Sequence, residues 1–299
     1  MDPVVTQSEL RGAGVTLAAD RWDPPSQDAG GSGVDRKGSV LLLHGGGQTR
    51  HSWRNTGRSL AADGWSAIAV DARGHGDSQW APDGDYGIDA LVADLTSVVS
   101  ELGEKPVLVG ASMGGMTSLI GQGENPDLAR GLVLVDIAPK VETSGTAEIM
   151  AFMRSGLEGF ASLDEAAAAI AAYTPNRVRK PNPDGLRKNL RLRDGRWFWH
   201  WDPAFLRQGD EPTRQADSIV RYERARKAAA AVTVPTMLVR GKESKVVSEE
   251  GAKELLELIP SAKLIDVTGA GHMVAGDDND VFSGGLTGFL DEDVIAARY

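Results

Sequence analysis

The chain has 299 residues, 41% of them hydrophobic and 25% charged, an ordinary globular composition that leaves room for a sizeable core. A formal net charge of −10 and a pI near 5.1 disfavour nonspecific attraction to nucleic acid or to an anionic membrane surface. The lack of cysteine excludes disulfides, zinc–thiolate sites and a thiol nucleophile, and the lack of a secretory signal or an apolar run of about 18 residues indicates a soluble cytoplasmic protein.

Up to about residue 38 the chain reads as the antiparallel edge of a sheet, with a strand at Val15–Asp23 and a polar, glycine-rich loop after it. Short apolar runs without strict alternation then alternate with longer amphipathic stretches, a pattern typical of parallel strands covered on both faces and joined by crossover helices. The expected parallel strands are Ser39–His44, Ser66–Asp71, Pro106–Ala111, Gly131–Asp136, Thr236–Gly241 and Ala262–Val267. The expected helices are 51–63, 88–102, 113–124, Ser248–Leu258 and a last one after about Asp278.

The strand rhythm stops between about Pro139 and Ala231. This stretch holds an alanine-rich helical run at Asp164–Tyr173, a proline-rich basic loop and the aromatic cluster "RWFWHWDP". We therefore predict an α/β core formed by residues 1–138 and 232–299, with residues 139–231 inserted as a helical cap.

A G-x-S-x-G pattern, centred on Ser112, follows the expected strand 106–111 directly and precedes the expected helix 113–124. That context is the one in which a nucleophile elbow forms. The glycines two positions away on each side let strand and helix approach, and the serine is held out over the carboxyl edge of the sheet. The amide of Met113, at the start of the helix, is expected to face an oxyanion that forms beside Ser112.

Three consecutive glycines follow the first parallel strand, in "LLLHGGGQTRHSW". Neither G-x-x-x-x-G-K-[ST] nor G-x-G-x-x-G is present at this turn, which argues against a nucleotide site. In a serine hydrolase the same turn supplies a second oxyanion donor from a bare backbone amide, and Gly46 is the candidate.

The candidate base is found by elimination among the histidines. No H-x-x-x-H pair occurs, which disfavours a metal site. His272 lies on a small-residue loop after the last expected strand, and its position after Ser112 in the chain fits the order of a hydrolase triad. His44 and His75 lie in glycine turns, where we expect structural roles for them, whereas His51 begins a helix and His200 lies in the cap.

Taken together, "HGGGQTRHSW", "VDARGHGDS", "VGASMGG", "LVLVDIAP" and "GAGHMVAGD" resemble the α/β-hydrolase superfamily, and within it the bacterial esterase and cofactor-free perhydrolase-like group. The resemblance extends over nearly the whole chain, least in the cap. It implies an α/β-hydrolase fold, a Ser–His–acid triad, a two-amide oxyanion hole and no cofactor. Epoxide hydrolases and haloalkane dehalogenases of this superfamily carry aspartate where Ser112 stands, so their chemistry is disfavoured.

The acid of the triad departs from the pattern. Relatives usually carry aspartate in the loop after the penultimate strand, where this chain has Lys245, and lysine cannot accept the imidazole N–H bond. Asp136, at the end of the strand that follows the Ser112 helix, is one replacement. Glu243, in the expected loop, is a second, and a Ser–His dyad without an acid is a third.

These residues predict a serine esterase that acts on a small or medium hydrophobic ester, without cofactor, metal or nucleic-acid partner. The expected catalytic set is Ser112, His272 and Asp136. An apolar pocket under the cap is expected to include tryptophans: Trp53, Trp197, Trp199 and Trp201. C–C bond hydrolysis or perhydrolysis on the same scaffold remains an alternative, as does a ligand-binding pseudo-hydrolase with little turnover.

Overall fold

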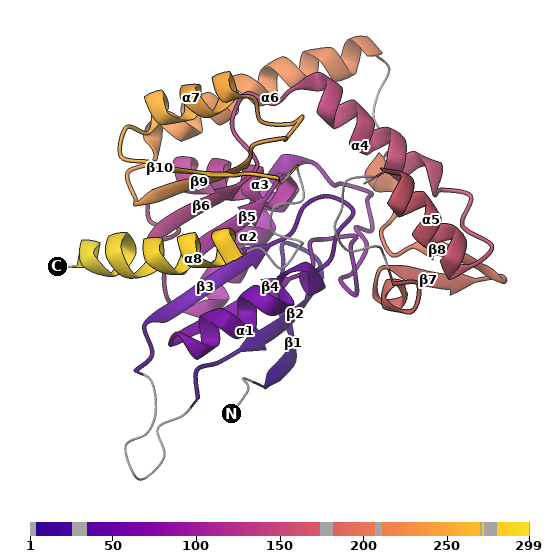
Figure 1. Cartoon of the computed structure of the whole chain (residues 1–299), viewed down its shortest axis with the longest axis horizontal. Helices are drawn as coiled ribbons and strands as arrows, with labels where there is room; N and C mark the ends of the chain where they lie inside the picture. Colours follow the sequence, from indigo (N-terminus) through magenta and orange to yellow (C-terminus); the bar gives the residue numbers. More distant parts are fainter. Residues whose placement is uncertain are drawn as a thin grey trace.

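A computed structural model of the chain shows one large twisted sheet with helices on both faces and a smaller body at one end (Figure 1). Six of the eight strands of the large sheet run parallel, and the first two lie antiparallel at one edge. This arrangement confirms the expected α/β-hydrolase fold. The structure describes residues 4–25, 35–173, 182–206, 211–269, 271 and 280–298.

The central strands are almost entirely buried because helices cover both of their faces, and this explains why their sequences lack polar alternation. In spatial order the strands are β1 (Val5–Arg11), β2 (Thr16–Trp22), β4 (Trp65–Val70), β3 (Gly38–Leu43), β5 (Val107–Ala111), β6 (Gly131–Val135), β9 (Thr236–Gly241) and β10 (Lys263–Val267).

Two apolar clusters hold the helices on the sheet. One packs beneath α1 and α8, and the other beneath α2, α3, α6 and α7. The helices are η1 (Arg50–Trp53), α1 (Arg54–Ala62), α2 (Ile88–Leu102), α3 (Met113–Glu124), α6 (Glu211–Ala231), α7 (Glu249–Leu258), α8 (Asp280–Phe289) and the π-helical turn η4 (Leu290–Ile295). Among the described helices none is long and apolar enough to cross a membrane.

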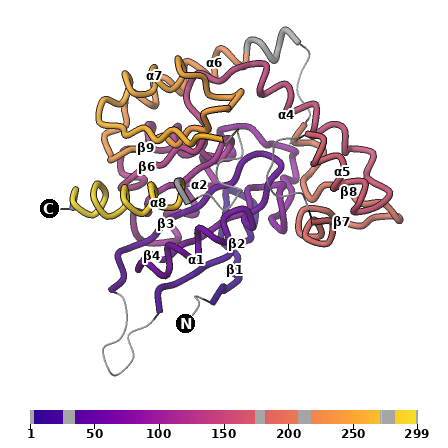
Figure 2. The backbone as a smooth tube through the Cα atoms, viewed as in Figure 1, coloured from indigo at the N-terminus to yellow at the C-terminus, as the bar shows by residue number. Residues whose placement is uncertain are grey.

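The segment between β6 and β9 contributes most of the smaller body, which lies beyond the carboxyl edge of the sheet in Figure 2. Its elements are α4 (Thr143–Ser155), α5 (Leu163–Tyr173), η2 (Asp184–Lys188), β7 (Leu190–Arg193), β8 (Arg196–Trp199) and η3 (Pro203–Leu206). The β7–β8 hairpin was not expected in a helical cap. We call the part from α4 to η3 the insertion. The last helix of the segment, α6, instead packs small residues such as Ala225 and Ala228 with α3 in the core.

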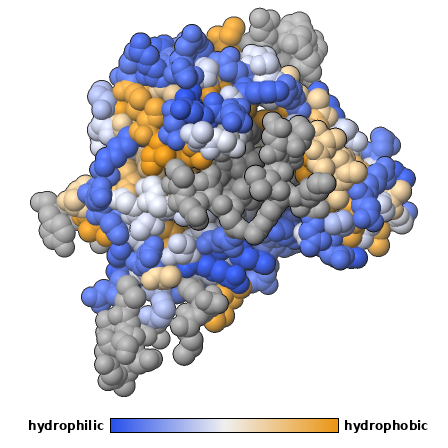
Figure 3. Space-filling model, in the orientation of Figure 1, coloured by the Kyte–Doolittle hydropathy of each residue, from blue (hydrophilic) through white to orange (hydrophobic). Residues whose placement is uncertain are grey.

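The surface of the insertion differs from that of the core. Helix α5 has six alanines among its eleven residues, and its outer face is weakly apolar in the space-filling view, among mostly hydrophilic neighbours (Figure 3). Its inner face joins a third apolar cluster that includes Phe160, Trp199 and Trp201. The insertion therefore has a small core of its own, which lets it hold a defined shape above the sheet edge.

Candidate active site

Ser112 occupies a strained turn between β5 and α3. Its φ of 46° and ψ of −110° lie in a region that a residue with a side chain avoids at a cost of about 1–3 kcal/mol. A methyl group on Gly110 would lie 2.5 Å from the backbone of Gly114, and one on Gly114 would lie 2.5 Å from the carbonyl of Leu43. Both glycines are therefore needed for the close crossing that holds Ser112 out, half-buried, at the carboxyl edge of the sheet.

The triple-glycine turn after β3 lies against this serine. A methyl group on Gly45 would be 3.3 Å from the Cβ of Ser112. The Gly45 amide donates to Gln48 Oε1 at 3.0 Å, and the Gly47 amide donates to His75 Nε2 at 3.1 Å. The amide of Gly46, between them, has no acceptor within the described part of the chain.

The start of α3 leaves a second such amide. The Gly114 amide donates to His44 O at 3.2 Å, whereas the amide of Met113 has no acceptor among the residues that the structure describes. Helix N-terminal amides carry partial positive charge and suit an anion. The amides of Gly46 and Met113 thus lie near Ser112 with capacity left for a developing oxyanion.

His44 controls the direction of the Gly46 amide. Its Nδ1–H donates to Gly45 O at 2.8 Å, and its Nε2 accepts from the Ala72 amide at 3.0 Å. Because the peptide between Gly45 and Gly46 is planar and trans, fixing the carbonyl on one side fixes the N–H on the other. Burial lowers the pKa of His44 to about 4, which keeps the imidazole neutral, the form that these two bonds require.

Asp136 lies at the end of β6, the strand next to β5. Its side chain is fully buried, its φ is 49°, and its Oδ1 accepts from the Gly241 amide at 3.1 Å. Its Oδ2 accepts from the Ser244 hydroxyl at 2.5 Å. The Ser244 oxygen in turn accepts from the amides of Val246 and Val247 at 3.0 and 3.3 Å, which directs its proton to the carboxylate. No pattern in the sequence marks Ser244 for this role.

The loop after β9, where an aspartate was expected, is occupied differently. Glu243 is exposed to solvent. Lys245 is also exposed, and its Nζ pairs with Glu148 Oε1 of α4 at 2.9 Å. Of the two candidate acids, Asp136 alone is held at the sheet edge by hydrogen bonds to its carboxylate within the described residues. His272 lies outside the described residues, and its pairing with Ser112 stays a prediction.

Known proteins share this architecture. A model of the alpha/beta hydrolase fold family matches residues 38–278 of the chain. The chain belongs to the α/β-hydrolase family. The esterase Rv0045c of Mycobacterium tuberculosis is 31% identical over 264 residues, which cover 84% of this chain and 82% of that protein. The sn-1-specific diacylglycerol lipase ABHD11 of Mus musculus is 30% identical over 231 residues, 72% of this chain and 68% of that one.

Solved structures agree with this assignment. A structure of the M. tuberculosis esterase Rv0045c superimposes with a TM-score of 0.71 at 29% identity, covering 97% of this chain and 93% of the other. A structure of E-2-(acetamidomethylene)succinate hydrolase has a TM-score of 0.78 at 24% identity over 96% and 100% of the two chains, which shows a shared fold. Family and relatives together make this protein a hydrolase, as the sequence predicted.

The insertion of this α/β hydrolase places apolar side chains over the glycine turn. A methyl group on Gly46 would lie 3.4 Å from Cζ of Phe205, and one on Gly47 would lie 3.0 Å from Cε of Met153 and 3.6 Å from Nε1 of Trp201. Phe205 and Met153 were not expected from the sequence. Only their positions in the chain could have suggested contact with the glycine turn, because Phe205 closely follows the tryptophan cluster and Met153 lies in the first helix of the insertion.

The four predicted pocket tryptophans have different surroundings. Trp201 contacts the glycine turn at Gly47. Trp199 is buried in the core of the insertion, and Trp197 is half-buried beneath the Arg187 guanidinium, 5.1 Å from its ring centre. Trp53 is 1% exposed and packs in the sheet cluster beneath α1 and α8, so its assignment to the pocket is corrected: η1 turns its ring into the core.

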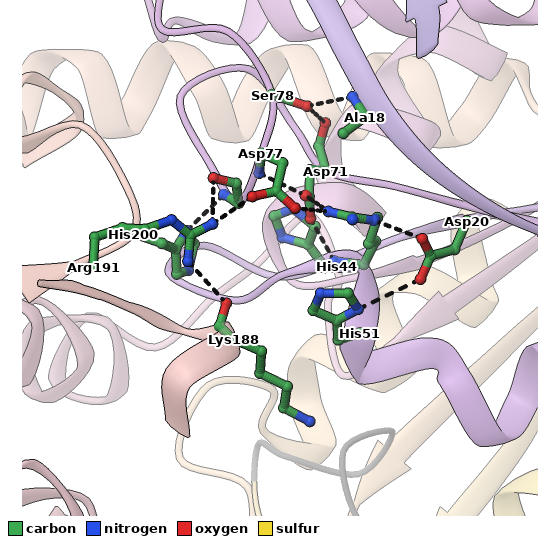
Figure 4. A network of polar contacts seen from close by, with 12 residues as sticks. Ala18, Asp20, His44, His51, Asp71, Asp77, Ser78, Lys188, Arg191 and His200 are labelled. Carbon is green, nitrogen blue, oxygen red and sulfur yellow. Dashed lines mark hydrogen bonds and ion pairs between the residues drawn. The ribbon is translucent and has the colours of Figure 1, made fainter. Parts of the chain in front are cut away.

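A buried ionic network steadies the turn that follows β4 (Figure 4). The Arg50 guanidinium donates to Asp20 and Asp77 at 2.9 Å and also pairs with Asp71. Burial alone would raise the pKa of Asp20, but its contacts with Arg50 and with His51, whose Nδ1 lies 3.4 Å from Oδ2, outweigh burial and hold that pKa at about 2. Removing one partner from such a buried set leaves an uncompensated charge, which typically destabilises a protein by about 3–5 kcal/mol.

Proposed function

We propose that this α/β hydrolase is a serine esterase that forms an acyl-enzyme on Ser112. The strained backbone of Ser112 carries this proposal, because a strained residue persists only where the surrounding structure holds it and such residues gather at active sites. In the proposed reaction His272 removes the hydroxyl proton as the oxygen attacks the acyl carbon. The Gly46 and Met113 amides then stabilise the oxyanion, which typically contributes about 3 kcal/mol for each donor.

The second half of the reaction regenerates the enzyme. His272 gives its proton to the departing alcohol, and it then accepts a proton from the water that attacks the acyl carbon. As the bond between that carbon and Ser112 Oγ breaks and the acid leaves, His272 returns the proton to Oγ. Asp136 orients the imidazole and stabilises its charged form during both steps. A buried acid, held on both oxygens, supports turnover over the ligand-binding alternative, which depended on the aspartate missing at Lys245.

A hydrophobic acyl group fits the surroundings of the oxyanion turn. Met153, Trp201 and Phe205 all lie within contact distance of Gly46 or Gly47, and none of these side chains carries charge. Apolar walls around a few polar groups are the usual composition of a small-molecule site. The relatives named as an esterase and a diacylglycerol lipase support an ester as the substrate.

Hydrolysis of p-nitrophenyl esters by a set of variants tests this function. Ser112→Ala is expected to abolish turnover, and Asp136→Asn to lower kcat by about 10⁴-fold because the imidazole loses its oriented tautomer. Glu243→Gln is the matched control, since it removes an exposed carboxylate of the neighbouring loop and should change kcat by less than about threefold. Full activity of Ser112→Ala would reject the mechanism, and a large loss in Glu243→Gln alone would move the acid to that loop.

A further inference from the structure

Three buried imidazoles lie in a row beside the active site. The ring centres of His44 and His75 are 5.2 Å apart, and those of His75 and His200 are 5.8 Å apart. The first two belong to the sheet domain, whereas His200 follows β8 of the insertion. Figure 4 shows His200 and Arg191 on the same side of the polar network, and both side chains contact the backbone of Gly76. The row therefore crosses the boundary between the two parts of the molecule.

His75 and His200 bind the two backbone polar groups of Gly47. His75 Nε2 accepts from the Gly47 amide at 3.1 Å, and its Nδ1–H donates to Arg73 O at 3.0 Å. His200 Nε2–H donates to Gly47 O at 3.3 Å, and its Nδ1 accepts from the Gly76 amide at 2.6 Å. Each ring thus bridges the glycine turn and the turn after β4, with one nitrogen as donor and the other as acceptor.

The segment around His200 is itself fixed to the sheet domain. The Asp202 amide donates to Gly74 O at 2.9 Å, and the Tyr86 hydroxyl donates to Asp202 Oδ2 at 2.5 Å. The Phe205 ring packs edge-on against His75, with ring centres 4.8 Å apart. His200 therefore contacts Gly47 from a rigid position, and it would lose this contact if the insertion moved away.

We propose that His200 is a positioning residue that completes the oxyanion hole from the insertion. His75 holds the Gly46–Gly47 peptide, which is next to the one that carries the Gly46 donor, through Gly47 N–H. His200 holds the following peptide through Gly47 O, so the two rings together restrain the backbone on that side of the donor. The oxyanion hole is then fully ordered only when the insertion is docked. This inference rests on the proposed function of Ser112, but it concerns a residue that need not contact substrate.

Two substitutions at His200 separate positioning from general stability. Leucine fills a similar volume but removes both hydrogen bonds, so His200→Leu is expected to lower kcat for p-nitrophenyl esters by about 10- to 100-fold with KM within about threefold of wild type. Glutamine keeps one donor and one acceptor, so His200→Gln is expected to restore kcat to within about threefold. Thermal unfolding of each variant, compared with wild type, checks that the fold is retained.

Arg191→Ala is the matched control. Arg191 Nη2 donates to Gly76 O at 3.1 Å and to Asp77 Oδ1 at 2.6 Å. Its loss therefore weakens the contact between the β7–β8 hairpin and the turn after β4 but removes no hydrogen bond to Gly47. Its kcat should stay within about threefold of wild type. Equal losses in His200→Leu and Arg191→Ala, or an unchanged kcat in His200→Leu, would overturn the proposal.

A measurement on the wild-type protein decides the matter if His200→Leu does not fold. Nitrogen-15 NMR of the histidine rings at pH 7 should find His200 neutral with its proton on Nε2. A proton on Nδ1, or an imidazolium, is incompatible with the two contacts and would overturn the inference. Because this spectrum needs no substrate, it separates failure at His200 from failure of the esterase function, which would show as turnover that does not depend on Ser112.

Discussion

The buried histidines make the fold sensitive to mild acid. Burial lowers the pKa of His44 to about 4 and that of His75 to about 3, and burial also lowers the pKa of His200 well below its ordinary value. In the unfolded chain each imidazole titrates near pH 6.5. Below that pH the unfolded chain takes up protons that the folded protein does not, so stability is full above pH 6.5 and falls as the pH approaches the folded values.

The size of the effect follows from these values. At pH 5 the unfolded chain is protonated at His44 and His75, whereas the folded protein is not, and each ring contributes a loss of about 2 kcal/mol relative to pH 7. His200 shifts in the same direction and adds to this. A combined loss of about 4 kcal/mol or more is a large part of the 5–15 kcal/mol that stabilises a typical domain.

Urea unfolding at pH 7 and pH 5 measures this loss. Carboxylates with lowered pKa values, such as Asp20, lose their contribution to the unfolding free energy only at lower pH. The change in stability between pH 7 and pH 5 therefore comes mainly from the histidines. His75→Gln keeps a donor and an acceptor without titrating, and it should remove about 2 kcal/mol of the difference between the two pH values. An unfolding free energy at pH 5 within about 1 kcal/mol of the pH 7 value would refute the reasoning.

Three further substitutions test the site. Gly114→Ala places a methyl group 2.5 Å from a backbone carbonyl, so it should lower the unfolding free energy by about 1–3 kcal/mol and abolish ester turnover. Gly288→Ala has open space around it and should change neither quantity in the same denaturation and kinetic assays. Ser244→Ala removes the hydroxyl from the buried carboxylate and should lower kcat about tenfold, while Lys245→Ala stays within about threefold; equal values would argue against the acid assignment. Phe205→Ala should raise kcat/KM for octanoate over acetate esters about tenfold, and an unchanged ratio would place the acyl pocket elsewhere.

The sheet domain was predictable because burial on two faces leaves a clear pattern. The strand at Thr236–Gly241 and the helices at 88–102 and 113–124 have the expected bounds. At the active site, the turn at Ser112 was predictable because glycines two positions away on both sides are needed for one backbone crossing. Local chemistry of this kind is visible in a short stretch of sequence.

Contacts between distant segments were not predictable. His200 binds Gly47 across 153 positions, and Ser244 binds Asp136 across 108, and neither donor belongs to a pattern that marks its partner. Trp53 shows the opposite error, because it was assigned to the pocket under the cap whereas its ring packs in the core.

The β7–β8 hairpin, by contrast, carried a readable signal. Asp194 and Gly195, with φ of 48° and 78°, form a two-residue turn between β7 and β8. Leucine occupies every second position of β7, and tryptophan occupies every second position of β8. The expectation of a helical cap arose because the alanine-rich stretch before the hairpin dominated the interpretation of the whole insertion.

The most direct test of the central claim is to map a fluorophosphonate adduct by mass spectrometry. The account predicts one adduct per chain, on the peptide that contains Ser112, forming at the rate at which esterase activity is lost, and no adduct on Ser112→Ala. Full activity in protein without an adduct, or inactivation with the adduct on another residue, would contradict the claim that this serine is the nucleophile.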